Sequence, residues 1–258
     1  MAANTLSRIT RGTGPALVLA HGAGGGAEAN WGTLIGPLAE HYSVIAPDYP
    51  GSGGSPVEEG PLDLDDLADR VVATAVEEGH DSFDLVGFSL GAAVSVRAAA
   101  RHPGRVRSLV LVAGVAEATS HVRLVVDALL AAERLSPELW GRFNLAFAFG
   151  SEWINRHSPA ELTLLAKAVA AGTPAGLRQQ FELVTTVDVS GDLAGITVPT
   201  LVISATADTL SVPAQHRRFA ERIPGARLLE LASGHLVTVE RGPELLAAVQ
   251  DFLAARHR

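Results

Sequence analysis

A serine, an aspartate and a histidine stand where nucleophilic chemistry would need them. Ser89 lies in the segment Gly87-Phe88-Ser89-Leu90-Gly91, between an apolar run and an alanine-rich run of helical character. A serine on so sharp a strand-to-helix turn has a strained backbone, and only glycine two residues to either side lets the strand and helix pass closely. The spacing predicts a nucleophilic serine. The alternative is a helix N-terminus in which Ser89 acts as the cap.

A serine nucleophile needs a base to take its proton, an acid to orient that base, and donors for the developing oxyanion. Ligands of open parallel sheets bind beyond the carboxyl ends of the strands, so residues just after a strand can meet there. Asp208 follows the apolar run 200–205, and His235 follows the run 226–231 in a small glycine-containing loop. We predict Asp208 as the orienting acid and His235 as the general base. Singly, an aspartate in a loop is more often a turn residue.

Two backbone N–H groups are the predicted oxyanion donors. The glycine-rich loop 21–26 leaves the run 16–20 and can aim the N–H of Ala23 at a reacting centre. Leu90 opens the helix after the serine, where unpaired N–H groups and the helix dipole favour negative charge. Apart from His21 and His235, the histidines follow no predicted strand and are expected to be structural: His41, His80, His102, His121, His157, His216 and His257.

The elements that must position these residues alternate between short strands and helices. The predicted strands are 16–20, 43–47, 83–88, 107–112, 200–205 and 226–231, and one helix lies between most of them. Continuous apolar character is typical of strands that are buried on both faces. The chain is therefore predicted to be an α/β protein with a mostly parallel central sheet and helices on both faces.

Residues 115–190 break this alternation and read as amphipathic helices. The pairs Ser136-Pro137, Ser158-Pro159 and Thr173-Pro174 each predict a helix start. We predict a helical cap, or lid, at 115–190, inserted into a core made of 1–114 and 191–258. Six of the 13 aromatic residues fall in this insert and form either its own core or a substrate-contacting cluster. The predicted substrate-binding residues are Trp140, Phe143, Phe147 and Trp153 in the insert and Leu236 beside His235.

The composition excludes several classes of function. The 258 residues are 47% hydrophobic and carry a net charge of -8, with Lys and Arg scattered, which argues against a nucleic-acid partner. The absence of cysteine excludes disulfides, thiolate catalysis and cysteine-ligated zinc. The nine histidines show no metal-binding spacing. We therefore predict neither a metal nor a cofactor.

The expected partner is a small or medium-sized, partly apolar substrate. Residues 1–11 are polar without a signal core, and the apolar runs are too short to span a membrane, so we expect a soluble, cytoplasmic protein without a membrane partner. The oligomeric state does not follow from the sequence. Four arginines of the insert are expected on solvated faces, although one turned inward would accept a carboxylate: Arg123, Arg142, Arg156 and Arg178.

Together these residues give the chain a resemblance to the α/β-hydrolase-fold serine hydrolases over essentially its whole length. The order Ser89, Asp208, His235 matches the nucleophile, acid and base of that family. The resemblance also rests on His21-Gly22, on the D-x-x-G-x-G-x-S turn at 48–55, and on Gly234-His235 with Glu240 and Pro243.

The helical insert resembles the cap of the esterase, haloperoxidase-like, lactonase and carbon–carbon bond hydrolase branches. Serine at position 89 argues against epoxide hydrolases and haloalkane dehalogenases, which have aspartate there. The resemblance implies hydrolysis of an ester, lactone, thioester or activated C–C bond through Ser89, His235 and Asp208. Acyl transfer, perhydrolysis, a lyase step or ligand binding without turnover stay open as uses of the same fold.

Dinucleotide binding is the alternative from another class. Gly22-x-Gly24-x-x-Ala27 follows a predicted strand, and Asp48 ends the next one at the distance expected of a ribose-binding acid. This interpretation leaves Ser89, Asp208 and His235 unexplained, so we favour the hydrolase.

Overall fold

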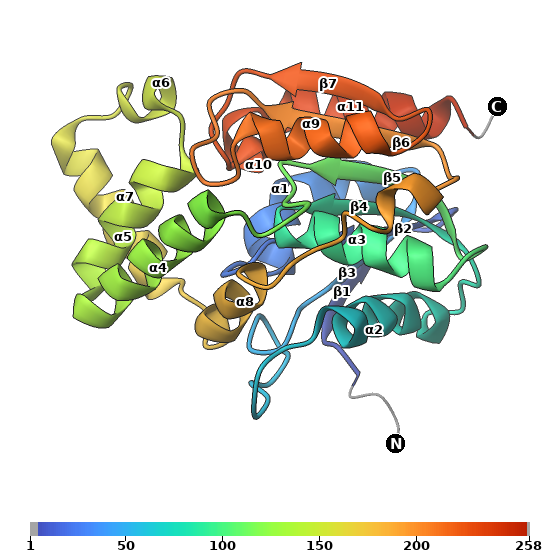
Figure 1. The fold of residues 1–258 in the computed structure, drawn as a ribbon, viewed down its shortest axis with the longest axis horizontal. Coiled ribbons are helices and arrows are strands. Elements are labelled where there is room, and N and C mark those ends of the chain that lie inside the picture. Colours follow the sequence, from blue (N-terminus) through green and yellow to red (C-terminus); the bar gives the residue numbers. More distant parts are fainter. Residues whose placement is uncertain (1–4, 257–258) are drawn as a thin grey trace.

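A mostly parallel sheet forms the centre of the molecule (Figure 1). The computed structural model describes residues 5–256, so His257 and the first four residues of the polar N-terminal segment lie outside it. Within that range, the strand order is β1-β3-β2-β4-β5-β6-β7, and all neighbours are parallel except β1, which is antiparallel to β3. The strands are β1 (Arg8–Arg11), β2 (Ala16–Ala20), β3 (Ser43–Pro47), β4 (Phe83–Phe88), β5 (Val106–Val112), β6 (Thr200–Ala205) and β7 (Arg227–Leu231).

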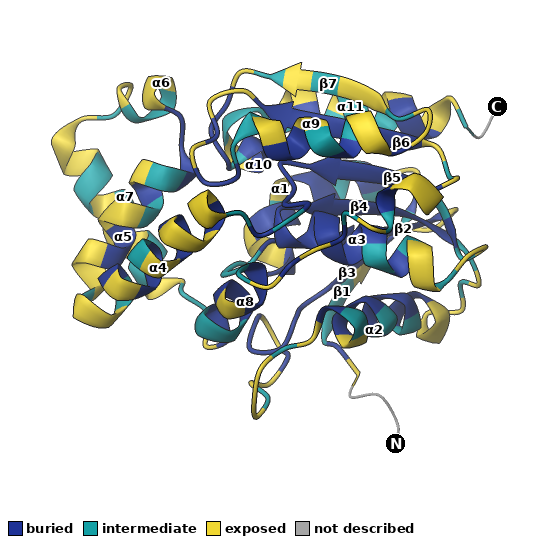
Figure 2. Ribbon diagram, viewed as in Figure 1, coloured by how far each residue is buried: buried dark blue, intermediate teal, exposed yellow. Residues whose placement is uncertain are grey.

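Helices cover both faces of this sheet. The first face is packed by α2 (Leu64–Glu77), α3 (Leu90–Arg101) and α9 (Pro213–Arg222), with the 3-10 turn η1 (Leu193–Gly195) beside them. The second face is packed by α1 (Ala27–Ala39) and α11 (Gly242–Ala254), which follows the short α10 (Val237–Glu240). Every residue of β2, β4 and β6 is buried, as Figure 2 shows for the middle of the sheet. The α/β class predicted from continuous apolar runs is confirmed.

The sequence predicts all of these strands except the first. β5 begins one residue before its predicted start, and β7 one residue after. The edge strand β1 is missed because Ile9 is its only apolar residue. Its formation depends on pairing with β3, where Ile9 lies opposite Ala46. A four-residue edge strand with charged ends has too weak a local pattern to be recognised.

The chain between β5 and β6 is helical. It forms α4 (Ser120–Leu135), α5 (Pro137–Ala148), α6 (Ser151–Ile154), α7 (Pro159–Ala171) and α8 (Leu177–Val184), which we call the insert. In Figure 1, α4 to α7 lie beyond one end of the sheet and α8 lies between them and the core. Among the described residues, no helix has both the length and the apolar character that crossing a bilayer requires. The division into folding units at 114/115 and 190/191 stays a prediction.

Two of the three predicted helix starts in the insert are confirmed. Ser136 caps α5, and Ser158 caps α7 in a reciprocal arrangement with Glu161. The third is wrong, because α8 begins at Leu177. The Thr173 hydroxyl is engaged elsewhere: it accepts from Trp140 Nε1 at 2.6 Å and donates to the Val169 carbonyl at 3.1 Å.

The burial of the central strands predicts where truncation is costly. Leu111 in β5 is fully buried, whereas Leu228 in the edge strand β7 is 42% exposed. We expect Leu111→Ala to lower the free energy of unfolding by about 2–5 kcal/mol through lost transfer energy and an unfilled cavity. The matched variant Leu228→Ala should cost about 1 kcal/mol or less. Urea unfolding followed by circular dichroism measures both, and equal losses would contradict the packing described here.

Candidate active site

Ser89 occupies a strained turn at the carboxyl end of β4. Its φ is 54°, in the left-handed region that side chains rarely adopt. A Cβ atom at Gly87 would lie 2.2 Å from the Gly91 carbonyl oxygen, and one at Gly91 would lie 2.2 Å from that of Ala20. Both glycines are therefore required by close backbone approach. The capping alternative is wrong, because the Ser89 side chain makes no cap hydrogen bond to α3.

A hydrogen-bonded chain runs from Ser89 to Asp208. His235 Nε2 lies 2.9 Å from Ser89 Oγ, and His235 Nδ1 lies 2.6 Å from Asp208 Oδ2. All three side chains are buried. With Nδ1–H donating to the carboxylate, Nε2 is left to accept the serine O–H. The structure thus brings together the three residues that the sequence singles out from loops after β4, β6 and β7.

Asp208 is a buried carboxylate with four polar neighbours. Its Oδ1 accepts hydrogen bonds from the N–H groups of Leu210 and Ser211 at 2.8 and 2.9 Å. Burial alone would raise the pKa of Asp208, but the His235 and His216 imidazoles beside it bring that pKa down to about 2. Asp208 is consequently ionised at neutral pH, and Oδ2 is directed at His235.

The loop that carries His235 is tied to the insert. Glu240 Oε1 accepts from the N–H groups of Gly234 and Gly150, both at 2.9 Å. Leu236 N–H donates to the Ala148 carbonyl at the end of α5, also at 2.9 Å. Glu240, one of the residues that carry the family resemblance, therefore holds the histidine loop against the insert.

The glycine-rich loop after β2 passes beside Ser89. A Cβ atom at Gly22 would lie 3.1 Å from Ser89 Cβ. Among residues 5–256, the N–H groups of Ala23 and Leu90 have no hydrogen-bond acceptor. Asn30, on the first turns of α1, accepts from Gly22 N–H at 2.9 Å, a contact that no sequence motif announces. Ala23 lines the same cavity as Ser89, and Leu90 is the next residue after Ser89, so both free donors belong to segments beside the serine.

His21 fixes the start of this loop as a neutral imidazole. Its Nε2 accepts from Tyr49 N–H at 2.9 Å, so the proton is assigned to Nδ1, which donates to the Gly22 carbonyl at 2.7 Å. Burial lowers the pKa of His21 to about 4, although the Gly22 carbonyl and Asp48 oppose the shift. The imidazole is uncharged at neutral pH.

Asp48, the residue on which the dinucleotide alternative depends, is engaged by the protein itself. Its Oδ1 accepts from Ala27 N–H, the first residue of α1, at 2.8 Å. A Cβ atom at Gly53 would lie 2.0 Å from its Oδ2, so the 48–55 turn wraps tightly around the carboxylate. Asp48 anchors α1 to this turn.

His216 is a functional candidate that the sequence reading misses. It is fully buried on α9, with Nδ1 3.2 Å from Ser204 Oγ and Nε2 3.4 Å from Asp208 Oδ2. At 3.4 Å the contact with the carboxylate is long for a hydrogen bond, yet it contributes to the low pKa of Asp208. His216 follows no strand, and its place on a helix gives no local signal that it faces the acid.

A cavity of about 370 Å³ opens on Ser89 and His235. Trp140 and Leu236, two of the predicted substrate-binding residues, line it. Among the described residues, its wall contains no Asp, Glu, Lys or Arg side chain. The polar groups in the wall, apart from Ser89 and His235, are Asn30, Asn144 and Thr173. The arrangement suits a neutral, largely apolar ligand.

The other three predicted substrate-binding residues do not line this cavity. Phe143 is 37% exposed and contacts Phe147, which packs against the hydrophobic core. Trp153 stacks on Phe149 with ring centroids 3.9 Å apart. These three rings therefore pack on other residues of the insert and, for Phe147, also on the main hydrophobic cluster.

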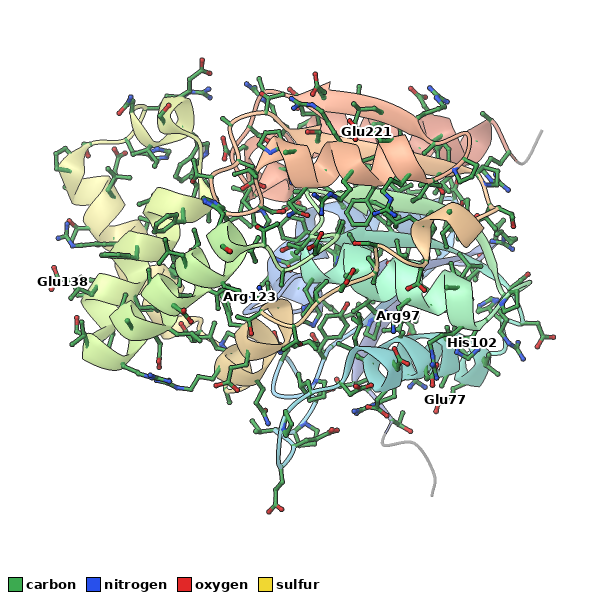
Figure 3. The ribbon with its side chains drawn as sticks, in the orientation of Figure 1. Glu77, Arg97, His102, Arg123, Glu138 and Glu221 are labelled. Carbon is green, nitrogen blue, oxygen red and sulfur yellow. The ribbon has the colours of Figure 1, made fainter. Side chains whose placement is uncertain are left out.

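The four insert arginines singled out from the sequence also lie away from the cavity. Arg123 donates to the Thr185 carbonyl at 3.1 Å, beside α8. Arg142 pairs with Glu138, which Figure 3 shows at the outer edge of the insert, on the side away from the sheet. The remaining two, Arg156 and Arg178, pair with Glu152 and Glu133.

Comparison with known proteins identifies the family. A family profile described as alpha/beta hydrolase fold matches residues 15–241. The chain is 34% identical to pyrrolizixenacetamide deacetylase of Xenorhabdus hominickii, over 94% of this chain and 92% of that protein. It is 30% identical to a candidate carbamate hydrolase, RutD, of Klebsiella pneumoniae, over 93% and 92% of the two chains. The enol-lactonase from Burkholderia xenovorans has a TM-score of 0.86 at 27% identity, with 96% of each chain covered.

The chain therefore belongs to the α/β hydrolase fold family. It is an enzyme of that family, a hydrolase, as are the relatives named above. The resemblance drawn from Ser89, Asp208, His235 and the surrounding motifs is confirmed at the level of family and fold.

The buried neutral His21 predicts a pH dependence of stability. An unfolded histidine binds a proton near pH 6.5, whereas folded His21 does so only near pH 4, so the unfolded state holds more protons between these values. Stability should fall as pH drops from 6.5 to 4, and His21 should account for on the order of 3 kcal/mol of that loss. In urea unfolding, the His21→Gln variant should be less stable than the wild type at pH 7.5. Its free energy of unfolding should change less than that of the wild type between pH 6.5 and pH 4. Parallel pH curves for the two proteins would contradict the neutral assignment.

Proposed function

We propose that the protein hydrolyses an ester-like or amide-like bond of a small to medium-sized, partly apolar substrate, with Ser89 as nucleophile. The observation that carries the proposal is the continuous chain from Ser89 Oγ through His235, both at the wall of the cavity, to Asp208 behind them. Such a chain supplies the nucleophile, base and orienting acid that acyl transfer to serine needs.

In the first half-reaction, Ser89 Oγ attacks the carbonyl carbon of the substrate while His235 Nε2 takes the hydroxyl proton. The carbonyl π electrons move to oxygen, and the N–H groups of Ala23 and Leu90 donate hydrogen bonds to the resulting oxyanion. When the tetrahedral intermediate collapses, His235 gives its proton to the leaving alcohol or amine. The product of this half is an acyl ester on Ser89.

The second half-reaction repeats these steps with water. The oxygen of a water molecule attacks the acyl carbon while His235 takes one of the water protons. His235 then gives this proton to Ser89 Oγ as the bond between Oγ and the acyl carbon breaks and the carboxylic acid leaves. Asp208 stays ionised throughout and stabilises the imidazolium that forms twice per turnover. The low pKa of Asp208 suits this role, because the carboxylate does not compete for the proton.

The cavity supports a neutral substrate. Trp140, Phe181 and Val126 supply apolar wall, and Asn144 adds a polar side chain, whereas the Thr173 hydroxyl is already bonded to Trp140 and to the Val169 carbonyl. The names of the relatives point to acyl bonds of amide, carbamate and lactone type, which share an attackable carbonyl carbon. An amide-linked short acyl group is a specific second candidate beside esters, because the relative with 34% identity is named a deacetylase. We take the insert to act as the cap that encloses this substrate.

The test is turnover of aryl esters and matching aryl amides with acyl chains of increasing length. Ser89→Ala and His235→Ala should each lower kcat by about 10⁶, and Asp208→Asn by about 10⁴, because the three residues act as one unit. His80→Ala is the matched histidine control, since His80 contacts Ser43 at the start of β3, far from the carboxyl ends of the strands. It should keep wild-type turnover.

Two other outcomes would contradict the proposal. Undiminished turnover in a correctly folded Ser89→Ala variant would exclude an acyl-serine intermediate. A wild-type protein that forms an acyl adduct on Ser89 but passes it to an added alcohol, amine or peroxide faster than to water would be an acyl transferase or perhydrolase. Intact-mass spectrometry of the adduct and product analysis distinguish these cases.

A further inference from the structure

Gln180 is a fully buried polar side chain on α8, and all of its hydrogen bonds leave the insert. Its Oε1 accepts from Gly24 N–H at 2.8 Å. Its Nε2 donates to the Pro50 carbonyl at 3.0 Å and to Ser52 Oγ at 2.8 Å. The partners fix the orientation of the amide, since an N–H only donates and a carbonyl only accepts. A buried amide with both ends satisfied in this way is held rigidly.

The partners of Gln180 lie in the loop that carries the proposed oxyanion donor and in the turn next to it. Gly24 is the residue next to Ala23, and its φ of 70° is one that glycine adopts readily. Ser52 Oγ, which accepts from Gln180, in turn donates to the Gly25 carbonyl at 2.6 Å. The N–H of Gly24 and the carbonyl of Gly25 are thus held by one network that begins on α8.

The helix also packs directly on this loop. A Cβ atom at Gly24 would lie 2.6 Å from Leu177 Cδ1 and from Phe181 Cε2. At the start of the same helix, Gly176 N–H donates to the Gly51 carbonyl at 3.0 Å. Figure 1 shows α8 between the rest of the insert and the core. The helix is therefore fastened to the core on two neighbouring loops.

We propose that Gln180 is a positioning residue for the oxyanion donors: by fixing Gly24 it aims the N–H of Ala23 at the carbonyl oxygen bound to Ser89. Gln180 does not line the cavity, so it acts through the loop rather than on the substrate. This inference rests on the proposed acyl-transfer function. It makes α8 part of the reaction machinery, in addition to any role in enclosing the substrate.

The physical reason is the glycine content of the loop. Gly22, Gly24, Gly25 and Gly26 give the backbone wide conformational freedom, and a donor that must reorient during the reaction stabilises charge poorly. Fixing the peptide on the carboxyl side of Ala23 removes that freedom before the substrate arrives. A misplacement of about 1 Å at such a donor costs up to about 10² in rate.

The neighbouring residue offers a matched control. Gln179 lies on the same helix, and its Nε2 donates to the carbonyls of Glu58 and Gly60 at 2.7 and 2.5 Å. Its bonds also join α8 to a core loop, but that loop does not line the cavity. Replacing Gln179 therefore tests the loss of an amide that ties the insert to the core without disturbing the 22–26 loop.

The experiment compares Gln180→Met, Gln180→Glu and Gln179→Met in the full chain. For aryl ester turnover, Gln180→Met should lower kcat about 10- to 100-fold with KM changed by less than about threefold, because the donor acts on the transition state. The affinity for an alkylboronic acid, which forms a tetrahedral adduct with Ser89, should fall by a similar factor. Gln180→Glu keeps an acceptor for Gly24 N–H and should recover part of the kcat and part of the affinity for the boronic acid. Gln179→Met should match the wild type in both quantities.

Hydrogen–deuterium exchange gives a readout that does not depend on activity. The segment 22–26 should exchange faster in Gln180→Met than in the wild type or in Gln179→Met. Where Gln180→Met does not fold, Ser52→Ala replaces it. This variant removes the contacts of Ser52 Oγ with the Gly25 carbonyl and with Gln180 Nε2, but it keeps the bond from Gly24 N–H to Gln180 Oε1, so it should shift kcat and exchange in the same direction by less.

The outcomes separate the two proposals. A wild type without Ser89-dependent turnover overturns the proposed function, and exchange of the 22–26 segment then decides whether Gln180 holds the loop. Unchanged exchange in Gln180→Met overturns the inference. The inference is also overturned if the wild type is active and Gln180→Met shows faster exchange but unchanged kcat and unchanged affinity for the boronic acid. Gln180 would then hold the loop without any effect on stabilisation of the oxyanion.

Discussion

The strained backbone of Ser89 is the constraint on which the site depends. A φ of 54° at serine persists only where the surrounding structure over-determines it, and here β4 and the first two turns of α3 are buried on either side of the turn. The two flanking glycines let the chain reverse within contact distance of β2. Because the sheet is parallel, the loops bearing Asp208 and His235 emerge at the same edge as this turn. Sheet topology and local strain thus fix the hydroxyl, base and acid together.

A buried carboxylate imposes the second requirement. Asp208 has lost its hydration, and the loss is offset by two backbone N–H groups on one oxygen and two imidazoles near the other. His216 is the less expected of the two imidazoles, since it reaches the acid from α9 and contacts Ser204 with its other nitrogen. Apart from His235, which comes from the loop after β7, these groups around Asp208 belong to the loop after β6 and the helix α9 that follows it.

The sequence predicts the parts of this structure that are specified locally, and misses those that depend on long-range contacts. Ser89, Asp208 and His235 follow apolar strands, so their chemistry and the sheet topology are enough to place them at one edge. Gln180 is 156 positions from Gly24, and neither residue type nor spacing signals that contact. The aromatic content of the insert predicts apolar wall but not which rings face the cavity, because the insert's helical periodicity does not say which face meets the core. Trp140 faces the cavity, whereas Phe143 and Trp153 do not.

The insert is not uniform in how it is bound to the core, and this difference bears on function. Residues of α4 and α8 such as Val126 and Phe181 belong to the same hydrophobic cluster as the sheet and α3. Leu145 and Ala166, on α5 and α7, belong to a separate small cluster of the insert. Local opening costs least where few buried contacts join a segment to the rest. Local opening should therefore begin in this small cluster, whereas α8 is held to the loop beside Ser89 both by the shared hydrophobic cluster and by the bonds of Gln180.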